Sequence, residues 1–141
     1  MKLTDLTVSR TIPATPEQVF DAWMDPKSPG GPWLGAAELS LDPVVGGLLY
    51  LKVEYQGRTW PHYGRFLRID RPRLVEYTWV SEATQGVESI VTVTFEPRGD
   101  GTEVTLRHAR VPDDAMGQQH REGWTWILNA LFERFASRAR R

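Results

Sequence analysis

The hydrophobic period of this chain changes once, near Val111, and that change limits the folds open to it. Between Ala36 and Ala109 apolar and polar residues alternate, which is typical of half-buried strands. After Val111 the apolar residues recur every three or four positions, as on one face of a helix. With 141 residues the chain is expected to form one hydrophobic core. The pattern predicts one α+β domain over residues 1–141, with a long C-terminal helix packed lengthwise on a curved antiparallel sheet.

Seven segments are predicted to be strands. The first, Val8–Ile12, ends at Pro13 and precedes the alternating region. The other six follow one another with short connections, which favours an antiparallel meander over a parallel sheet. One helix cannot cover the concave face of such a sheet completely, so we expect a cavity between them. The six strands are Ala36–Leu41, Leu48–Tyr55, Thr59–Asp70, Leu74–Val80, Val87–Pro97 and Glu103–Ala109.

A short helix is predicted directly after the first strand. Three residues mark its start: Thr15 can cap it, Pro16 suits the first helical position, and Gln18 can close a capping box. Val19, Phe20 and Trp23 then share one face of that helix at helical spacing.

The second predicted helix is the long C-terminal one. Asp113 and Asp114 precede it, where acidic side chains suit a helix N-terminus. Gly117 and Gly123 weaken its beginning, so a frayed start is expected, with the regular helix beginning near His120. The apolar stripe consists of Trp124, Ile127, Leu128, Leu131, Phe132 and Phe135.

Alternation predicts which strand residues face inward. Placing Glu76 and Thr78 in water sends Tyr77 and Trp79 toward the helix. On the next strand, Val91, Val93 and Phe95 face inward. The segment Thr59–Asp70 is ambiguous, because both of its faces carry apolar residues. One face holds Trp60, His62, Phe66 and Arg68, and the other holds Tyr63, Arg65, Leu67 and Ile69.

Several motifs in the same order resemble one superfamily over nearly the whole chain. The chain is similar to the START/Bet v 1-like, or SRPBCC, superfamily, and more narrowly to the branch of activators of the heat-shock protein 90 ATPase. The motifs are Ile12–Trp23, Trp33, Asp42–Gly47, Tyr63–Leu67, Pro72–Trp79, Gly101–His108 and Gly123–Trp124. The resemblance implies the helix-grip fold, in which the sheet holds the C-terminal helix over a ligand cavity. It names no ligand, because a shared fold does not define a function.

Charge and composition exclude several classes of protein. The 17 Lys and Arg residues are balanced by 18 Asp and Glu, for a net charge of -1, whereas nucleic-acid binding depends on surplus cations. The chain has no cysteine, which excludes disulfides and thiol chemistry. No apolar run has the ~18 residues of a membrane span, and Met1–Asp5 lacks the apolar core of a secretory signal. We therefore expect a cytoplasmic protein that binds neither nucleic acid nor membrane.

The three histidines carry no recognisable metal motif. His62, His108 and His120 lie far apart in the sequence without the spacing of zinc sites, so neither a metal nor a cofactor is expected. His108 is interpreted either as a hydrogen-bonded residue at the end of a strand or as a ligand donor at the cavity rim. His120, one helical turn before Trp124, is either a ligand contact or a satisfied core histidine. No serine has a Gly-x-Ser-x-Gly context, and no catalytic group is identified.

The leading hypothesis is a small-molecule binding domain that holds an apolar or aromatic ligand between the last helix and the sheet. Binding is favoured over catalysis, because the helix face toward the sheet carries no general acid–base pair. The alternatives are a cyclase- or hydrolase-like enzyme using the same cavity, and a chaperone-associated interaction module. A homodimer stays open, since Trp126 lies on the opposite helical face. The predicted ligand-binding residues are Tyr77, Trp79, Met116, His120 and Trp124.

Overall fold

The computed structural model describes residues 1–27, 33 and 36–139. The strands and helices follow one another in the order that the hydrophobic period predicts. In order they are β1 (Leu3–Ile12), α1 (Pro16–Met24), β2 (Glu38–Leu41), β3 (Leu48–Tyr55), β4 (Arg58–Asp70), β5 (Leu74–Ser81), η1 (Glu82–Thr84), β6 (Ser89–Arg98), β7 (Gly101–Pro112) and α2 (Ala115–Ala139).

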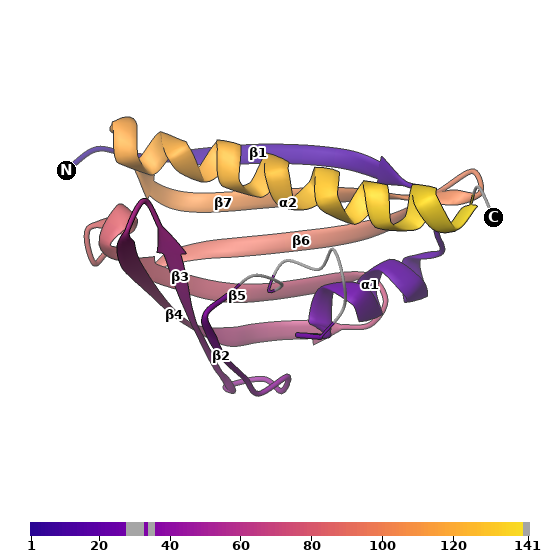
Figure 1. The fold of residues 1–141 in the computed structure, drawn as a ribbon, viewed down its shortest axis with the longest axis horizontal. Coiled ribbons are helices and arrows are strands. Elements are labelled where there is room, and N and C mark those ends of the chain that lie inside the picture. Colours follow the sequence, from indigo (N-terminus) through magenta and orange to yellow (C-terminus); the bar gives the residue numbers. More distant parts are fainter. Residues whose placement is uncertain (28–32, 34–35, 140–141) are drawn as a thin grey trace.

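The strands form one curved antiparallel sheet in the order β1-β7-β6-β5-β4-β3-β2. Helix α2 runs along the β1–β7 side of the sheet, and α1 packs against β6 (Figure 1). The β3–β4 hairpin bends away from the plane of the other strands toward the face that carries the helices (Figure 1). This is the helix-grip arrangement, and it confirms the predicted fold class. Among the residues described, no helix is both long and apolar enough to cross a membrane.

The strand at the N-terminus is longer than predicted. It begins at Leu3 rather than Val8, because its whole length pairs with β7, from Leu3 opposite Pro112 to Ile12 opposite Thr102. Strand β7 likewise continues to Pro112, beyond the expected end at Ala109. Backbone pairing extended both strands past the region where side chains alternate clearly.

Strand β4 presents both of its faces to the core at different points, which explains why its pattern was ambiguous. Gly64 and Phe66 are buried, whereas Tyr63 and Leu67 are exposed. A register shift between Phe66 and Arg68 then reverses the alternation. Ile69 therefore packs against the core, although it belongs by counting to the outer face.

Helix α2 is regular from Ala115, so the expected frayed start is wrong. Asp114 caps it, because its Oδ1 accepts a hydrogen bond from the Gly117 backbone N–H at 2.7 Å. A Cβ on Gly117 would lie 1.9 Å from the Pro112 carbonyl oxygen. Glycine is therefore required by a close backbone approach, and it does not mark a flexible joint.

The capping box at the start of α1 is confirmed. Thr15 Oγ1 accepts a hydrogen bond from the Gln18 backbone N–H at 3.2 Å, and Gln18 Oε1 accepts one from the Thr15 N–H at 3.0 Å. We predict that Thr15→Ala lowers the free energy of unfolding by about 1 kcal/mol, because the Gln18 backbone N–H loses its acceptor and the reciprocal capping box is broken. Urea denaturation followed by circular dichroism measures this loss, and an unchanged midpoint would show that the box contributes nothing.

The core lies between the concave face of the sheet and the two helices. The inward residues predicted on β6 and the central part of the α2 stripe are buried, which confirms both patterns. Thr78, expected in water, is instead buried on the convex side, where its Oγ1 accepts a hydrogen bond from the Arg65 N–H at 2.9 Å. The core contains Val91, Val93, Phe95, Leu128, Leu131 and Phe135.

Candidate functional site

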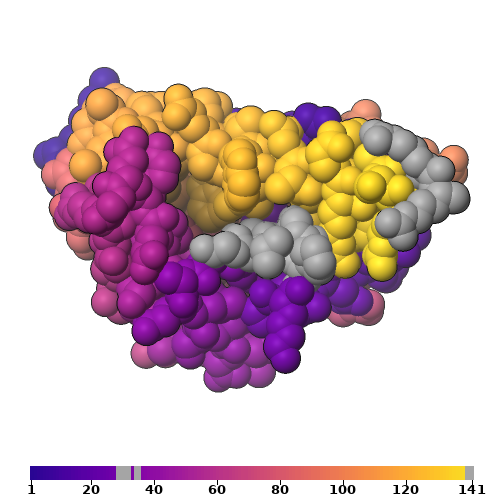
Figure 2. Space-filling model, in the orientation of Figure 1, coloured from indigo at the N-terminus to yellow at the C-terminus, as the bar shows by residue number. Residues whose placement is uncertain are grey.

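A line of aromatic side chains crosses the core from α1 to α2. We call Trp23, Trp33, Tyr77, Trp79 and Trp124 the aromatic cluster. Along the line, ring centroids lie 6.5 Å apart for Trp23–Trp33, 5.9 Å for Trp33–Tyr77, 6.2 Å for Tyr77–Trp79 and 5.2 Å for Trp79–Trp124. Every member is buried. The cluster joins α1, β5 and α2, which are far apart in sequence. On the surface, the β3–β4 hairpin lies beside the first turns of α2 (Figure 2).

The structure brings four of the five predicted site residues together. Tyr77 and Trp79 project side by side from β5, and Trp124 of α2 packs on Trp79. His120 lies one helical turn before Trp124, half-buried. Met116 is 37% exposed in the first turn of α2, so the α2 stripe reaches the surface there. Whether these residues contact a ligand stays a prediction.

His108 connects α2 to the sheet through both of its ring nitrogens. The indole N–H of Trp124 can only donate, so His108 Nδ1 accepts its hydrogen bond, at 3.0 Å. The proton of the neutral ring therefore lies on Nε2, which donates to Ser89 Oγ at 2.7 Å. Ser89 in turn donates to the Trp79 carbonyl oxygen at 2.5 Å. Of the two interpretations of His108, a hydrogen-bonded residue or a ligand donor at the cavity rim, the structure therefore shows the first. His108 is completely buried.

The fold brings the three histidines to the same end of the aromatic cluster. His62 of β4 lies with its ring 4.8 Å from Trp79, and the rings of His108 and His120 are also 4.8 Å apart. His120 Nδ1 donates to the Gly117 carbonyl oxygen at 2.9 Å, which leaves its Nε2 as an acceptor. Within the described ranges, no group of three or more histidines and carboxylates could hold a metal ion.

Burial keeps these histidines neutral. It lowers the pKa of His62 to about 4, with a further lowering from His120. It lowers the pKa of His108 to about 3, again with His120 adding to the effect. The pKa of His120 is also lowered by burial, against opposing effects of its bond to Gly117 and of the Asp114 charge. At neutral pH this end of the cluster therefore offers uncharged imidazoles.

Several buried polar atoms in and beside the cluster have no hydrogen-bond partner among the residues described. They are Trp23 Nε1, His62 Nδ1, Tyr77 Oη and Trp79 Nε1. Burial also raises the pKa of Tyr77, so its hydroxyl stays protonated. The Trp23 indole opposes that rise, although the two groups do not reach hydrogen-bond geometry. Unpaired buried polar groups are uncommon in proteins, and each one marks a place where a partner is missing.

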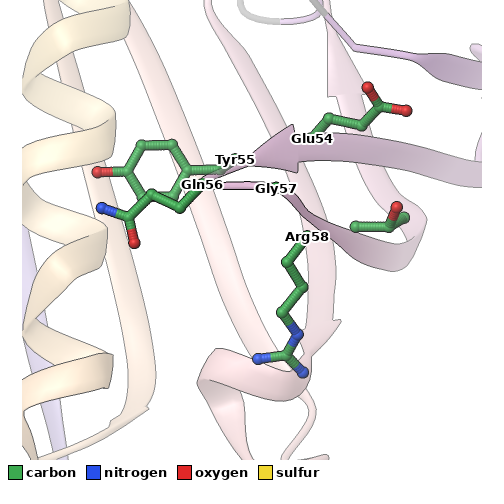
Figure 3. A pocket seen from close by; sticks show the side chains of 6 residues that line it. Glu54, Tyr55, Gln56, Gly57 and Arg58 are labelled. Carbon is green, nitrogen blue, oxygen red and sulfur yellow. The ribbon is translucent and has the colours of Figure 1, made fainter.

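Two surface hollows lie away from these residues. One, of about 380 Å³, lies at the tip of the β3–β4 hairpin, where Tyr55 and Gln56 extend on one side and Arg58 points toward η1 (Figure 3). The Arg58 guanidinium is paired there with Glu82. The other, of about 510 Å³, lies on the convex face between Leu48, Tyr63 and Leu67. Neither is lined by any of the predicted site residues, and a cavity along the aromatic cluster stays a prediction.

Sequence reasoning missed three residues that complete this site. Ser89 and Trp23 carried no signal of a polar role, because their partners come from other elements. His62 lies far in sequence from the other histidines, so residue spacing does not connect it with them. Its position two residues after Trp60 on an apolar-rich face was the one available signal.

A comparison with protein-family models gives a match over most of the chain. The family model described as Activator of Hsp90 ATPase homolog 1-like protein matches residues 13–136. A search of curated proteins finds no match.

Solved structures show the same fold. A protein of Chromobacterium violaceum is 22% identical with a TM-score of 0.79, over 93% of this chain and 96% of that one. CalU16 from Micromonospora echinospora is 26% identical with a TM-score of 0.69, over 90% of this chain and 73% of that one. An HSP90 activator from Plasmodium falciparum is 22% identical with a TM-score of 0.72, over 91% of this chain and 92% of that one.

Proposed function

We propose a ligand-binding function for this chain, which belongs to the family of Activator of Hsp90 ATPase homolog 1-like proteins. In this proposal the aromatic cluster binds a compact apolar or aromatic small molecule between α2 and the sheet. The proposal is carried by the buried polar atoms of Trp23, Tyr77 and Trp79, which have no hydrogen-bond partner among residues 1–27, 33 and 36–139. A plain core packs apolar atoms or satisfies its polar ones, whereas a binding site keeps a few polar groups free to orient a ligand.

The proposed contact residues are Tyr77, Trp79, Met116, His120 and Trp124. Tyr77, Trp79 and Trp124 supply flat apolar surface, and His120 keeps Nε2 free as an acceptor. Met116, at the exposed start of α2, is proposed to close over the ligand with its flexible thioether. The cluster lies in the core, so a ligand enters by displacing side chains on the side where α2 meets the β3–β4 hairpin.

Fluorescence titration tests this proposal, with a panel of flat aromatic and fatty molecules followed through the tryptophans. We predict saturable binding of at least one flat aromatic molecule, weakened about tenfold or more by Tyr77→Ala combined with His120→Ala, because an aromatic contact and a hydrogen bond are lost. Tyr63→Ala, on the exposed convex face, serves as the control and is expected to leave affinity unchanged. Binding that survives the double substitution would refute this site, and turnover of a panel member would favour the enzyme alternative.

A chaperone-associated role is the second candidate, and the family description favours it. The exposed apolar surface of Leu48, Tyr63 and Leu67 on the convex face is the region proposed for that role. Adding the purified chain to a heat-shock protein 90 ATPase assay separates the two candidates. A faster ATPase that Tyr63→Ala abolishes would support the chaperone role, while an unchanged rate leaves ligand binding as the function.

A further inference from the structure

Two neighbouring polar atoms of the aromatic cluster are buried and unpaired on the same strand. Tyr77 Oη and Trp79 Nε1 have no hydrogen-bond partner within the described residues, and their side chains are 0% and 5% exposed. Residues two apart on a strand point to the same side of the sheet. Both side chains therefore lie on the concave side of the sheet, and both atoms carry the desolvation penalty of an unpaired buried group.

Two of the other three indoles of the cluster are paired, whereas Trp23 Nε1 has no partner among the described residues. Trp33 Nε1 donates to the Trp23 carbonyl oxygen at 2.6 Å, and Trp124 Nε1 donates to His108 Nδ1 at 3.0 Å. The fold thus provides acceptors for these two indoles and not for Trp79. Trp79 shares its lack of a described acceptor with Trp23 of α1, and it is the one of the two that lies on β5 beside Tyr77. An indole N–H can only donate.

We propose, on the basis of the ligand-binding function above, that the ligand is an uncharged apolar molecule presenting an acceptor oxygen, such as a ketone carbonyl, to Trp79 Nε1 and the Tyr77 hydroxyl. A carbonyl oxygen has two lone pairs and can accept from both donors at once. A hydrocarbon has no acceptor and leaves both groups unpaired, whereas an amine nitrogen has one lone pair and can accept from only one of the two donors.

The surroundings of Trp79 disfavour a charged ligand. Both ring nitrogens of neutral His108 are already hydrogen-bonded, because Nδ1 accepts from the Trp124 N–H and Nε2 donates to Ser89 Oγ. His120 already donates its one proton to Gly117, and burial lowers the pKa of His62. A carboxylate placed beside Trp79 would therefore be buried without a cation, which is strongly unfavourable.

Arg134 is the cation to consider, because its Nη1 is also buried without a described partner. It lies ten residues after Trp124 on α2, which is about 15 Å along the helix axis. Its guanidinium stacks on Phe135, 4.9 Å from the ring centroid. A compact ligand held at Trp79 does not reach it, whereas an elongated acid could, so the test includes this residue.

Three probes with one skeleton test the proposal: naphthalene, 2-acetylnaphthalene and 2-naphthoate, each titrated at pH 7.5 by tryptophan fluorescence. We predict that 2-acetylnaphthalene binds about tenfold more tightly than naphthalene, which is the effect of one good hydrogen bond. 2-Naphthoate is expected to bind more weakly than the ketone. The infrared carbonyl band of bound 2-acetylnaphthalene should lie at lower frequency than in an apolar solvent.

Trp79→Phe and Tyr77→Phe remove one donor each and keep a ring. Each is expected to reduce the preference for the ketone over naphthalene and to move the carbonyl band back to higher frequency. Trp126→Phe and Tyr63→Phe, which make the same changes at exposed positions, are the matched controls. Naphthalene affinity reports on folding, because a variant that still binds the hydrocarbon has kept its core.

The outcomes separate this inference from the function on which it rests. If none of the probes binds, the proposed function itself fails. If naphthalene and the ketone bind equally, or if both variants keep the preference for the ketone, the acceptor proposal is overturned while ligand binding stands. The proposal is equally overturned if 2-naphthoate binds as tightly as the ketone, above all if Arg134→Gln abolishes its binding.

Discussion

Trp124→Ala is expected to lower the free energy of unfolding by about 3–5 kcal/mol, the range for deleting a buried aromatic side chain. Trp124 is 4% exposed and packs on Trp79 at 5.2 Å and on His108 at 6.0 Å between ring centroids. The substitution leaves a cavity under α2 and removes the donor for His108 Nδ1. Urea denaturation followed by circular dichroism gives the change directly.

Two further variants divide this loss into its parts. Trp124→Phe keeps a ring but leaves His108 Nδ1 without its donor, for an expected cost of about 1–3 kcal/mol. Trp126→Ala, two positions along the helix but 67% exposed, should stay within about 0.5 kcal/mol of the parent. Equal losses at Trp124 and Trp126 would contradict the assignment of the buried helix face.

Stability is expected to fall steeply as the pH is lowered from 6.5 toward 4. In the folded protein the pKa of His62 is lowered to about 4 and that of His108 to about 3, from 6.5. Between these values the unfolded chain binds more protons than the folded one, so stability rises with pH and is complete above 6.5. Each buried histidine contributes about 1.4 kcal/mol per pH unit, so His62 and His108 together give a slope of about 2.7 kcal/mol per pH unit.

The pH window separates histidines from carboxylates. The pKa values of Asp5 and Asp21 are lowered by hydrogen bonds from Arg107 and Arg71. Their stabilisation is present above 3.8 and is lost at lower pH. Urea midpoints at pH 7.5, 6.0 and 5.0 therefore report on the histidines. His62→Gln is expected to reduce the slope by about 1.4 kcal/mol per pH unit, and a parent midpoint that is constant over this range would contradict the buried neutral histidines.

Local chemistry made much of this molecule predictable. The inward direction of Tyr77 and Trp79 followed from alternation around Glu76, and the capping box from Thr15 and Gln18. The buried face of α2 followed from the spacing of its apolar residues. Each of these features depends on residues within a few positions of one another, where the geometry of a strand or helix alone determines which side chains share a face.

Contacts between distant segments decided the rest. Ile69 turned inward because a bulge in the pairing of β4 with β5 reversed the alternation, which no count along one strand reveals. The sequence predicts that Gly117 weakens the start of α2, whereas the close carbonyl of Pro112 is the reason for a glycine at this position.

The sequence by itself determined the order of strands and helices, the inward faces of β5, β6 and α2, and the family. Only the tertiary structure brought His62, His108 and His120 to one end of the aromatic cluster and satisfied His108 through Ser89 and Trp124. It also left Tyr77 Oη and Trp79 Nε1 without a partner in the part of the chain that the structure describes. A hydrogen bond between two polar atoms requires a distance of about 3 Å. Sheet register and helix docking set that distance, so it cannot be predicted from the spacing of residues along the chain.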